Sequence, residues 1–225
     1  MRNITVSILV LICAISAFSQ LDGNPPSWCR GGSFLHESED YQIARINGDA
    51  KEKAFFLDDT REGCPGKGCE SKSYVVPEDE VVISRIWNDW ACAWYSAKKG
   101  AGTVGWLPIK RIDLIPGTLS PLQNEWLGNW KYADNSIAIK NGTGGSLTLT
   151  GNATWRGLGD NIHIGELDHK ASPAGNILKL GEEDKDELEC KVTLRLLGRY
   201  MVVSDNMKCG GANVTFSGVY LKAKK

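Results

Sequence analysis

A polar cluster in the C-terminal half has the residue types of a metal or acid–base site. The segment HIGELDH places His163, Glu166 and His169 close together. On an extended strand the two histidines would share one face and Glu166 would lie on the other, because side chains alternate. The three groups would then not converge on one ion. We expect surface or turn positions for them, and we predict no bound metal.

Two carboxylates in the same segment could serve hydrolysis. Glycoside hydrolases use a pair of Asp or Glu side chains that flank the scissile bond. Glu166 and Asp168 would share one face of an extended strand over residues 162–168. Such pairs are also common on solvated strands. A cell-wall hydrolase, or an accessory subunit of one, is therefore the alternative hypothesis to a non-catalytic protein.

Other signatures of catalysis are missing from the sequence. It contains no Gly-x-Ser-x-Gly elbow, no His-Glu-x-x-His pair and no phosphate-binding glycine loop. The acidic run at residues 182–187 lacks the ligand spacing and glycine of a calcium-binding loop. The formal charge is −1, from 26 basic and 27 acidic side chains, so no global field attracts nucleic acid. We expect a protein that is not an enzyme and needs no cofactor.

The first 19 residues have the form of a secretory signal peptide. Arg2 gives a cationic start, residues 4–18 are almost wholly apolar, and Ala17 and Ser19 are small residues before a cleavage point. A membrane anchor is the rival reading, but a spanning helix needs about 20 apolar residues. We predict a periplasmic or secreted protein with no stable membrane insertion after cleavage.

Six cysteines follow the signal peptide, and an even number in an oxidising compartment indicates disulfides. The chain divides between Cys92 and Cys190, which makes Cys190–Cys209 the natural pair of the second half. That bridge would contribute roughly 3 kcal/mol through loop entropy. The other four cysteines leave three pairings open: Cys29, Cys64, Cys69 and Cys92.

Residues 77–115 read as a series of short strands. A diverging turn at Pro77 precedes strands at 81–86, 90–95 and 104–108, and Pro108 leads through a short helical turn to a closing strand near Ile112 and Leu114. The order and spacing resemble bacterial SH3-like domains. Upstream, residues 41–46 and 53–57 are expected to form a hairpin across Asn47-Gly48-Asp49, and residues 58–72 a long loop.

The first half as a whole resembles a group of secreted bacterial SH3-like proteins. The matching residues are Cys64-Pro65, Cys69, Tyr74, Pro77-Glu78-Asp79, Trp90-Ala91-Cys92 and the segment from Gly105 to Pro108. Peptide-binding SH3 domains carry a tyrosine after the last segment, where this chain has Lys110-Arg111. Polyproline binding is therefore not expected. Aromatic side chains remain as binding candidates, with core packing as the alternative for the tryptophans: Trp87, Trp90, Tyr95 and Trp106.

A Pro- and Gly-rich linker at residues 116–124 separates this half from a second group of strands. We predict an all-β chain: a signal peptide (1–19), a lead-in (20–37), an SH3-like barrel (38–115) and a small antiparallel barrel of about eight strands (125–225). The start of the second half, from Trp126 to Trp130, resembles avidin-type ligand-binding barrels. Its end resembles a module found beside lysozyme-inhibitor-like domains in secreted bacterial proteins. The two halves are expected to fold independently.

A turn-rich loop next to Cys209 is the binding candidate of the second half. It contains Asp205-Asn206 and Gly210-Gly211, residue types that tight turns also require. The hypothesis from the whole sequence is a non-catalytic envelope binding protein. Its expected partner is an envelope protein, including a wall hydrolase such as lysozyme that it would inhibit, or a peptidoglycan fragment.

The covalent structure can be tested first. We expect the mature protein to begin at or near Gln20 and to contain no free thiol, with Cys190 joined to Cys209, because an even cysteine count follows a signal peptide. Intact-mass analysis and peptide mapping without reduction measure both features. Two or more alkylatable thiols would contradict the prediction.

Overall fold

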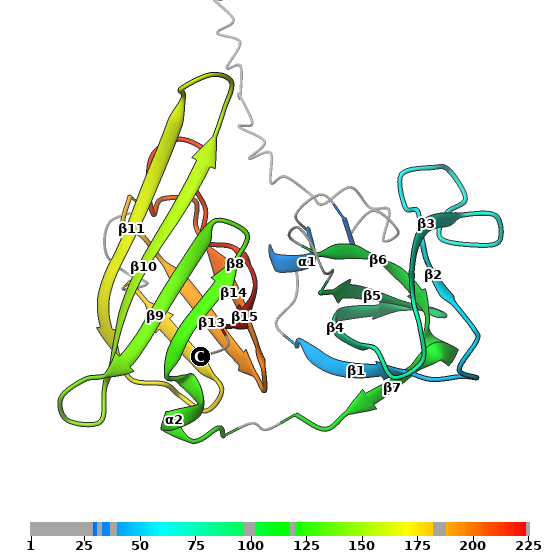
Figure 1. Cartoon of the computed structure of the whole chain (residues 1–225), viewed down its shortest axis with the longest axis horizontal. Coiled ribbons are helices and arrows are strands. Elements are labelled where there is room, and N and C mark those ends of the chain that lie inside the picture. Colours follow the sequence, from blue (N-terminus) through cyan, green and yellow to red (C-terminus); the bar gives the residue numbers. More distant parts are fainter. Residues whose placement is uncertain are drawn as a thin grey trace, which may run out of the picture.

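The computed structural model describes residues 29–30, 33–36, 40–96, 102–117, 120–181 and 188–223. The expected signal peptide and the acidic run at 182–187 lie outside these ranges. The described chain is all-β, with a seven-stranded sheet in the first half and a nearly closed eight-stranded antiparallel barrel in the second (Figure 1). The predicted fold class is confirmed at this level. None of the described helices is long and apolar enough to span a membrane.

The first half contains a short helix followed by seven strands. Its elements are α1 (Ser33–His36), β1 (Gln42–Ile46), β2 (Ala54–Leu57), β3 (Glu70–Val75), β4 (Glu80–Trp87), β5 (Trp90–Tyr95), β6 (Thr103–Pro108), the 3-10 helix η2 (Ile109–Arg111) and β7 (Ile112–Ile115). The strands are ordered β3-β2-β6-β5-β4-β1-β7. The expected helical turn after Pro108 and the closing strand are both present.

The expected hairpin across Asn47-Gly48-Asp49 is wrong. β1 pairs with β4 and β7, whereas β2 pairs with β3 and β6. The reason is Arg111, whose Nε donates to the Asn47 carbonyl oxygen at 2.9 Å and whose guanidinium lies 3.0 Å from the Glu52 carboxylate. Both ends of the turn, at Asn47 and Glu52, contact the Arg111 side chain, and β2 then pairs with β3 instead of β1. β3 also begins inside the expected loop at 58–72.

The second half is an up-and-down barrel. Its elements are α2 (Gln123–Trp126), β8 (Gly128–Tyr132), β9 (Asn135–Asn141), β10 (Leu147–Arg156), β11 (Ile162–Ala171), β12 (Ile177–Leu180), β13 (Val192–Leu197), β14 (Tyr200–Asp205) and β15 (Gly218–Lys222). The first strand pairs with the last, and the sheet runs β11-β10-β9-β8-β15-β14-β13-β12. β11 and β12 approach each other without a ladder, so the barrel is closed except for this seam.

Large side chains fill the barrel interior. Trp126, Trp130, Phe216 and Tyr220 are fully buried in one apolar cluster with inward residues of the strands. The Trp130 indole donates to the Trp126 carbonyl oxygen at 2.9 Å, which satisfies a polar group that would otherwise be costly to bury. The interior is therefore a packed core in the described chain.

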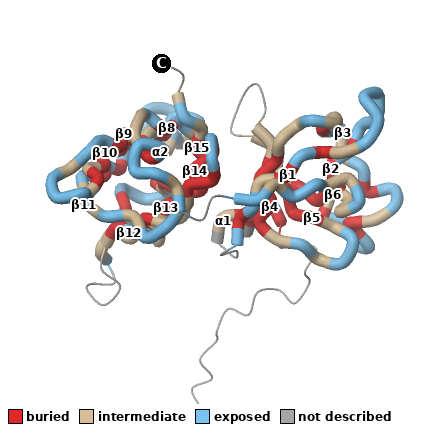
Figure 2. The backbone as a smooth tube through the Cα atoms, turned by 90° about the horizontal axis from the view of Figure 1, so that it is seen from below, coloured by how far each residue is buried: buried red, intermediate tan, exposed pale blue. Residues whose placement is uncertain are grey.

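A second apolar cluster joins the two halves. Trp94 of β5 meets Tyr200 of β14 edge to face, with ring centroids 6.0 Å apart. Phe34 of α1 is buried in the same cluster, and α1 lies between the halves in both views (Figures 1 and 2). Cys29 belongs to it too, through its disulfide to Cys92. Each half therefore covers apolar surface of the other, while folding of the isolated halves remains a prediction.

Tyr200→Ala tests this shared cluster. Because Tyr200 is fully buried at the junction, we expect the substitution to lower the free energy of unfolding by about 3–5 kcal/mol. Fluorescence of the first-half tryptophans and far-ultraviolet circular dichroism should report one common, lowered transition. The control is Tyr74→Ala, at a side chain 43% exposed on β3. Unchanged unfolding of the first half in Tyr200→Ala would contradict the coupling.

Candidate functional site

The loop between β14 and β15, residues 206–217, lies at one end of the barrel beside the long β10–β11 hairpin (Figure 1). The Cys190–Cys209 disulfide anchors it, so that predicted pair is confirmed. The pairings left open by the sequence are Cys29–Cys92 and Cys64–Cys69. The loop therefore has a covalent link to the segment that precedes β13.

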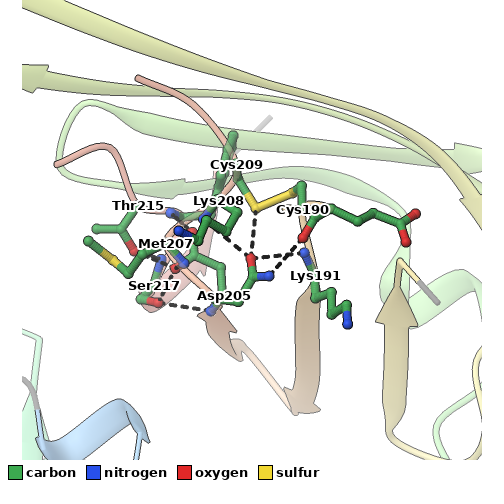
Figure 3. Close-up of a disulfide and its surroundings, with 11 residues drawn as sticks. Cys190, Lys191, Asp205, Met207, Lys208, Cys209, Thr215 and Ser217 are labelled. Carbon is green, nitrogen blue, oxygen red and sulfur yellow. Dashed lines mark hydrogen bonds between the residues drawn. A yellow bond between two sulfur atoms is a disulfide. The ribbon is translucent and has the colours of Figure 1, made fainter. Parts of the chain in front are cut away.

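The carboxylate of Asp205 organises the loop from below. It accepts hydrogen bonds from the Thr215 hydroxyl and the Phe216 backbone N–H, both at 2.7 Å, and from the Ser217 hydroxyl at 2.9 Å (Figure 3). Asp205 is 8% exposed, so the expectation of an exposed binding residue is corrected. These bonds hold residues 215–217 on the carboxylate, and β15 begins directly after them at Gly218.

Asn206 fixes the start of the same loop. Its Oδ1 accepts from the backbone N–H groups of Lys191 at 3.0 Å and Lys208 at 3.3 Å, and its Nδ2 donates to the Glu189 carbonyl oxygen at 2.7 Å. The side chain thus bridges the loop and the entry to β13, and its Oδ1 lies 4.0 Å from the Cys209 sulfur. Its amide is committed to holding the loop rather than presented to a partner.

Gly210 and Gly211 pack the loop against β11. A Cβ on Gly210 would stand 2.7 Å from the Gly165 Cα, and a Cβ on Gly165 would overlap the Cys209 carbonyl oxygen. The Gly211 N–H donates to the Ile164 carbonyl oxygen at 3.1 Å. Gly165, which sequence reasoning missed, is thus required for this close approach. The one sequence signal for this role was a glycine in the middle of a strand whose other residues carry apolar or charged side chains.

His163 adds a polar contact to this junction. Its Nδ1 lies 2.6 Å from the Ala212 carbonyl oxygen and therefore carries the proton, since a carbonyl oxygen only accepts. The imidazole lies against the Trp155 ring, with centroids 5.1 Å apart and ring planes inclined by 34°. His163 thus links β11 to the loop.

Apolar groups remain exposed on both elements. Leu158 at the hairpin turn is 97% exposed, Ile162 and Ile164 of β11 are 49% and 62% exposed, and Met207 of the loop is 49% exposed. Met207 also has a positive φ of 61°, which is uncommon for a residue with a long side chain. We call these four side chains, with the exposed loop residues 210–213, the loop–hairpin surface.

The aromatic candidates of the first half do not form one surface. Trp106 is fully buried, so of the two interpretations core packing holds for it and it is not an exposed binding residue; β6 places it inside the cluster between the halves. Trp87 and Trp90 are half-buried against that cluster, with Trp87 tilted 6.2 Å from Trp106. Tyr95 lies at the other end of β5. Side chains alternate along β5: Trp90, Cys92 and Trp94 share one face, and Ala91, Ala93 and Tyr95 share the other.

Tyr95 belongs to a polar pocket of about 500 Å³ at the junction. Its hydroxyl donates to Asp79 at 3.3 Å, and burial together with that carboxylate raises the pKa of the phenol. Arg199 of the barrel pairs with Glu80 of β4 at 2.8 Å in the same pocket. The Arg199–Glu80 pair joins a residue of the second half to a residue of the first, so the polar pocket lies where the two halves meet.

The HIGELDH segment forms part of β11. Burial alternates along it, with Gly165 and Leu167 buried and Glu166 and Asp168 exposed, as an extended strand requires. His163 and His169 share the inward side, so the predicted separation from Glu166 is confirmed. Within the described ranges, no three His, Cys, Asp or Glu side chains gather in a group that could hold a metal ion.

Comparison with known proteins adds no relative: the chain matches no protein-family model, no curated protein and no solved structure.

Asp205→Ala tests the origin of the loop's order. Removing a buried carboxylate leaves its donors unpaired, so we expect a loss of about 2–4 kcal/mol in the free energy of unfolding. Amide hydrogen exchange should accelerate in residues 206–217 before it does elsewhere in the barrel. Asp168→Ala, at an exposed carboxylate on β11, is the matched control and should change stability by under about 0.5 kcal/mol. Equal effects of the two substitutions would contradict the assigned role.

Proposed function

We propose that this protein is a non-catalytic binding protein of an oxidising, extracytoplasmic compartment, and that its loop–hairpin surface recognises a protein partner. A wall hydrolase that it would inhibit is one such partner. The observation that carries the proposal is the exposure of Leu158, Ile162, Ile164 and Met207 on two elements that contact each other at one end of the barrel. Exposed aliphatic groups at a protruding site are typical of protein–protein contact.

The rigidity of the loop supports the same proposal. The disulfide, Asp205 and Asn206 hold the loop at its base, and Gly211 ties it to β11. A loop that is already ordered loses little conformational entropy when a partner binds. The buried and bonded residues thus act as positioning residues, and the contacts come from the side chains around them. This division favours a protein partner over a glycan, which would use exposed polar and aromatic groups.

Location and the SH3-like assignment belong to the proposal as well. Three disulfides support an oxidising compartment, because such bonds persist there and are rare in the cytosol. The meander β4–β5–β6, followed by η2 and by a strand β7 that returns to β1, supports an SH3-like reading of the first half. In this reading the first half stabilises and presents the barrel through the junction around Trp94 and Tyr200.

The hydrolase alternative has less support. Glu166 and Asp168 are both exposed on the outward side of β11, and neither lines the polar pocket at the junction. Paired catalytic carboxylates flank a bound sugar, which calls for a cleft on the side where they lie.

Ile164→Asp tests the loop–hairpin surface. The immobilised full chain is first used to capture an envelope protein, which is identified by mass spectrometry and purified. We expect Ile164→Asp to lower the affinity for this partner about tenfold, which corresponds to ~1.4 kcal/mol. The control is Ile86→Asp on β4, where the side chain is 49% exposed on the other half. It should leave the affinity within about twofold.

Three outcomes would overturn the proposal. The first is equal loss of affinity in Ile164→Asp and Ile86→Asp with both variants folded. The second is hydrolysis of purified peptidoglycan by the protein at a rate that is lost in Glu166→Gln. The third is retention on peptidoglycan without hydrolysis and unaffected by Ile164→Asp, which would place recognition on the wall and away from this surface.

A further inference from the structure

The free edges of the two sheets are protected unequally. The edge strand β3 exposes Glu70 and Lys72, and its pairing with β2 contains a register shift. β11 and β12 face each other across the barrel seam, and the loop at Gly211 bonds to the edge of β11. Charges, bulges and covering segments are the usual means by which proteins prevent an edge from pairing with another chain.

β7 is the fourth edge, and its pairing with β1 runs without a register shift. Three of its four residues are apolar: Ile112, Leu114 and Ile115. Its one charged residue, Asp113, accepts a hydrogen bond from the Asn47 side chain at 2.8 Å. Leu114 is 48% exposed. A mainly apolar edge with a single charge is a candidate for strand addition.

The pairing of β7 with β1 shows which backbone groups are free. The Asn47 N–H donates to the Arg111 carbonyl oxygen at 3.1 Å, and antiparallel pairs alternate between bonded and non-bonded positions. Leu114, opposite Ala44, is therefore in a non-bonded pair. Its N–H and C=O point away from β1, and no described residue bonds to them. Pro116 ends the edge because it has no N–H.

An apolar crevice of about 560 Å³ lies beside this edge. β1 and β7 form one wall through Ile43, Leu114 and Ile115, and the barrel contributes Asn176 and Leu197 to the other. The crevice is continuous with the cluster between the halves, since Leu197 is buried in that cluster and Ile43 packs against it. A chain lying along β7 would thus have apolar surface to cover on its crevice side.

We propose that the free edge of β7 binds an extended peptide segment with aliphatic side chains at alternate positions. An extended backbone is the partner that can bond to both the N–H and the C=O of Leu114, and its period of two directs every second side chain into the crevice. This site is separate from the loop–hairpin surface and does not depend on the function proposed there.

The test uses the full chain and an acetylated, amidated hexapeptide of alternating Thr and Val. Amide exchange of Leu114, resolved by NMR, should be fast in the free protein compared with Asp113, and should slow at least about tenfold at saturating peptide while Asp113 changes little. Alternate residues of an added strand direct their N–H groups toward the edge with which the strand pairs. Two methylated peptides are therefore compared, one with its three valines N-methylated and one with its three threonines N-methylated. One of them should no longer protect the Leu114 amide, and the other should protect it as before.

Protein variants give an independent readout. Leu114→Lys keeps the β1 ladder and adds a charge at the edge, so peptide affinity should fall about tenfold. Leu122→Lys, at a leucine 69% exposed outside the crevice, should leave the affinity within about twofold. Slow exchange of Leu114 in the free protein, no protection at saturating peptide, or equal losses in the two variants would each overturn the proposal.

Discussion

One buried carboxylate determines how the second half ends. Asp205 gathers a hydroxyl and a backbone N–H from residues ten and eleven positions further along the chain, together with the Ser217 hydroxyl. A buried charge of this kind is tolerable only when its lone pairs are filled, and here loop residues fill them. β15 begins at Gly218, directly after these bonded residues, and its pairing with β8 closes the barrel between its first and last strands. Closure of the barrel and presentation of the loop therefore rest on the same carboxylate.

The junction between the halves shows a different use of burial. Trp94, Trp106 and Tyr200 are aromatic side chains that a single domain would place in its own centre, yet here they lie in a cluster to which both halves contribute. Around this apolar centre lie charged contacts such as Arg199 with Glu80. Exposed ion pairs contribute little energy, so the aromatic contacts supply most of the attraction and the charges fix the orientation. Two small sheets are in this way combined into one larger folded body.

Much of this architecture could be predicted from local patterns. The strand at 90–95 and the helical turn after Pro108 follow from neighbours in the sequence, and the Cys190–Cys209 pair follows from the division of the chain into two halves. The errors have a common cause in distant partners. Arg111 overrides the turn signal at Asn47, 64 positions earlier, and Asp205 looks like an exposed turn residue until Thr215 to Ser217 fold onto it. The role of Gly165 is visible only once Cys209 and Gly210 lie against it.

The split origin of the junction has a consequence for how the chain is made. Ribosomes deliver the first half before the second, and domains generally begin to fold as they emerge. β5 and β6 can form, and Cys29 can find Cys92, while Tyr200, Val202 and Val219 do not yet exist. During that interval the indole of Trp94 has no aromatic cover from the barrel. The nascent protein thus passes through a stage in which the apolar surface around Trp94 is exposed to other chains. β14 and β15, the last strands to be synthesised, finally cover this surface.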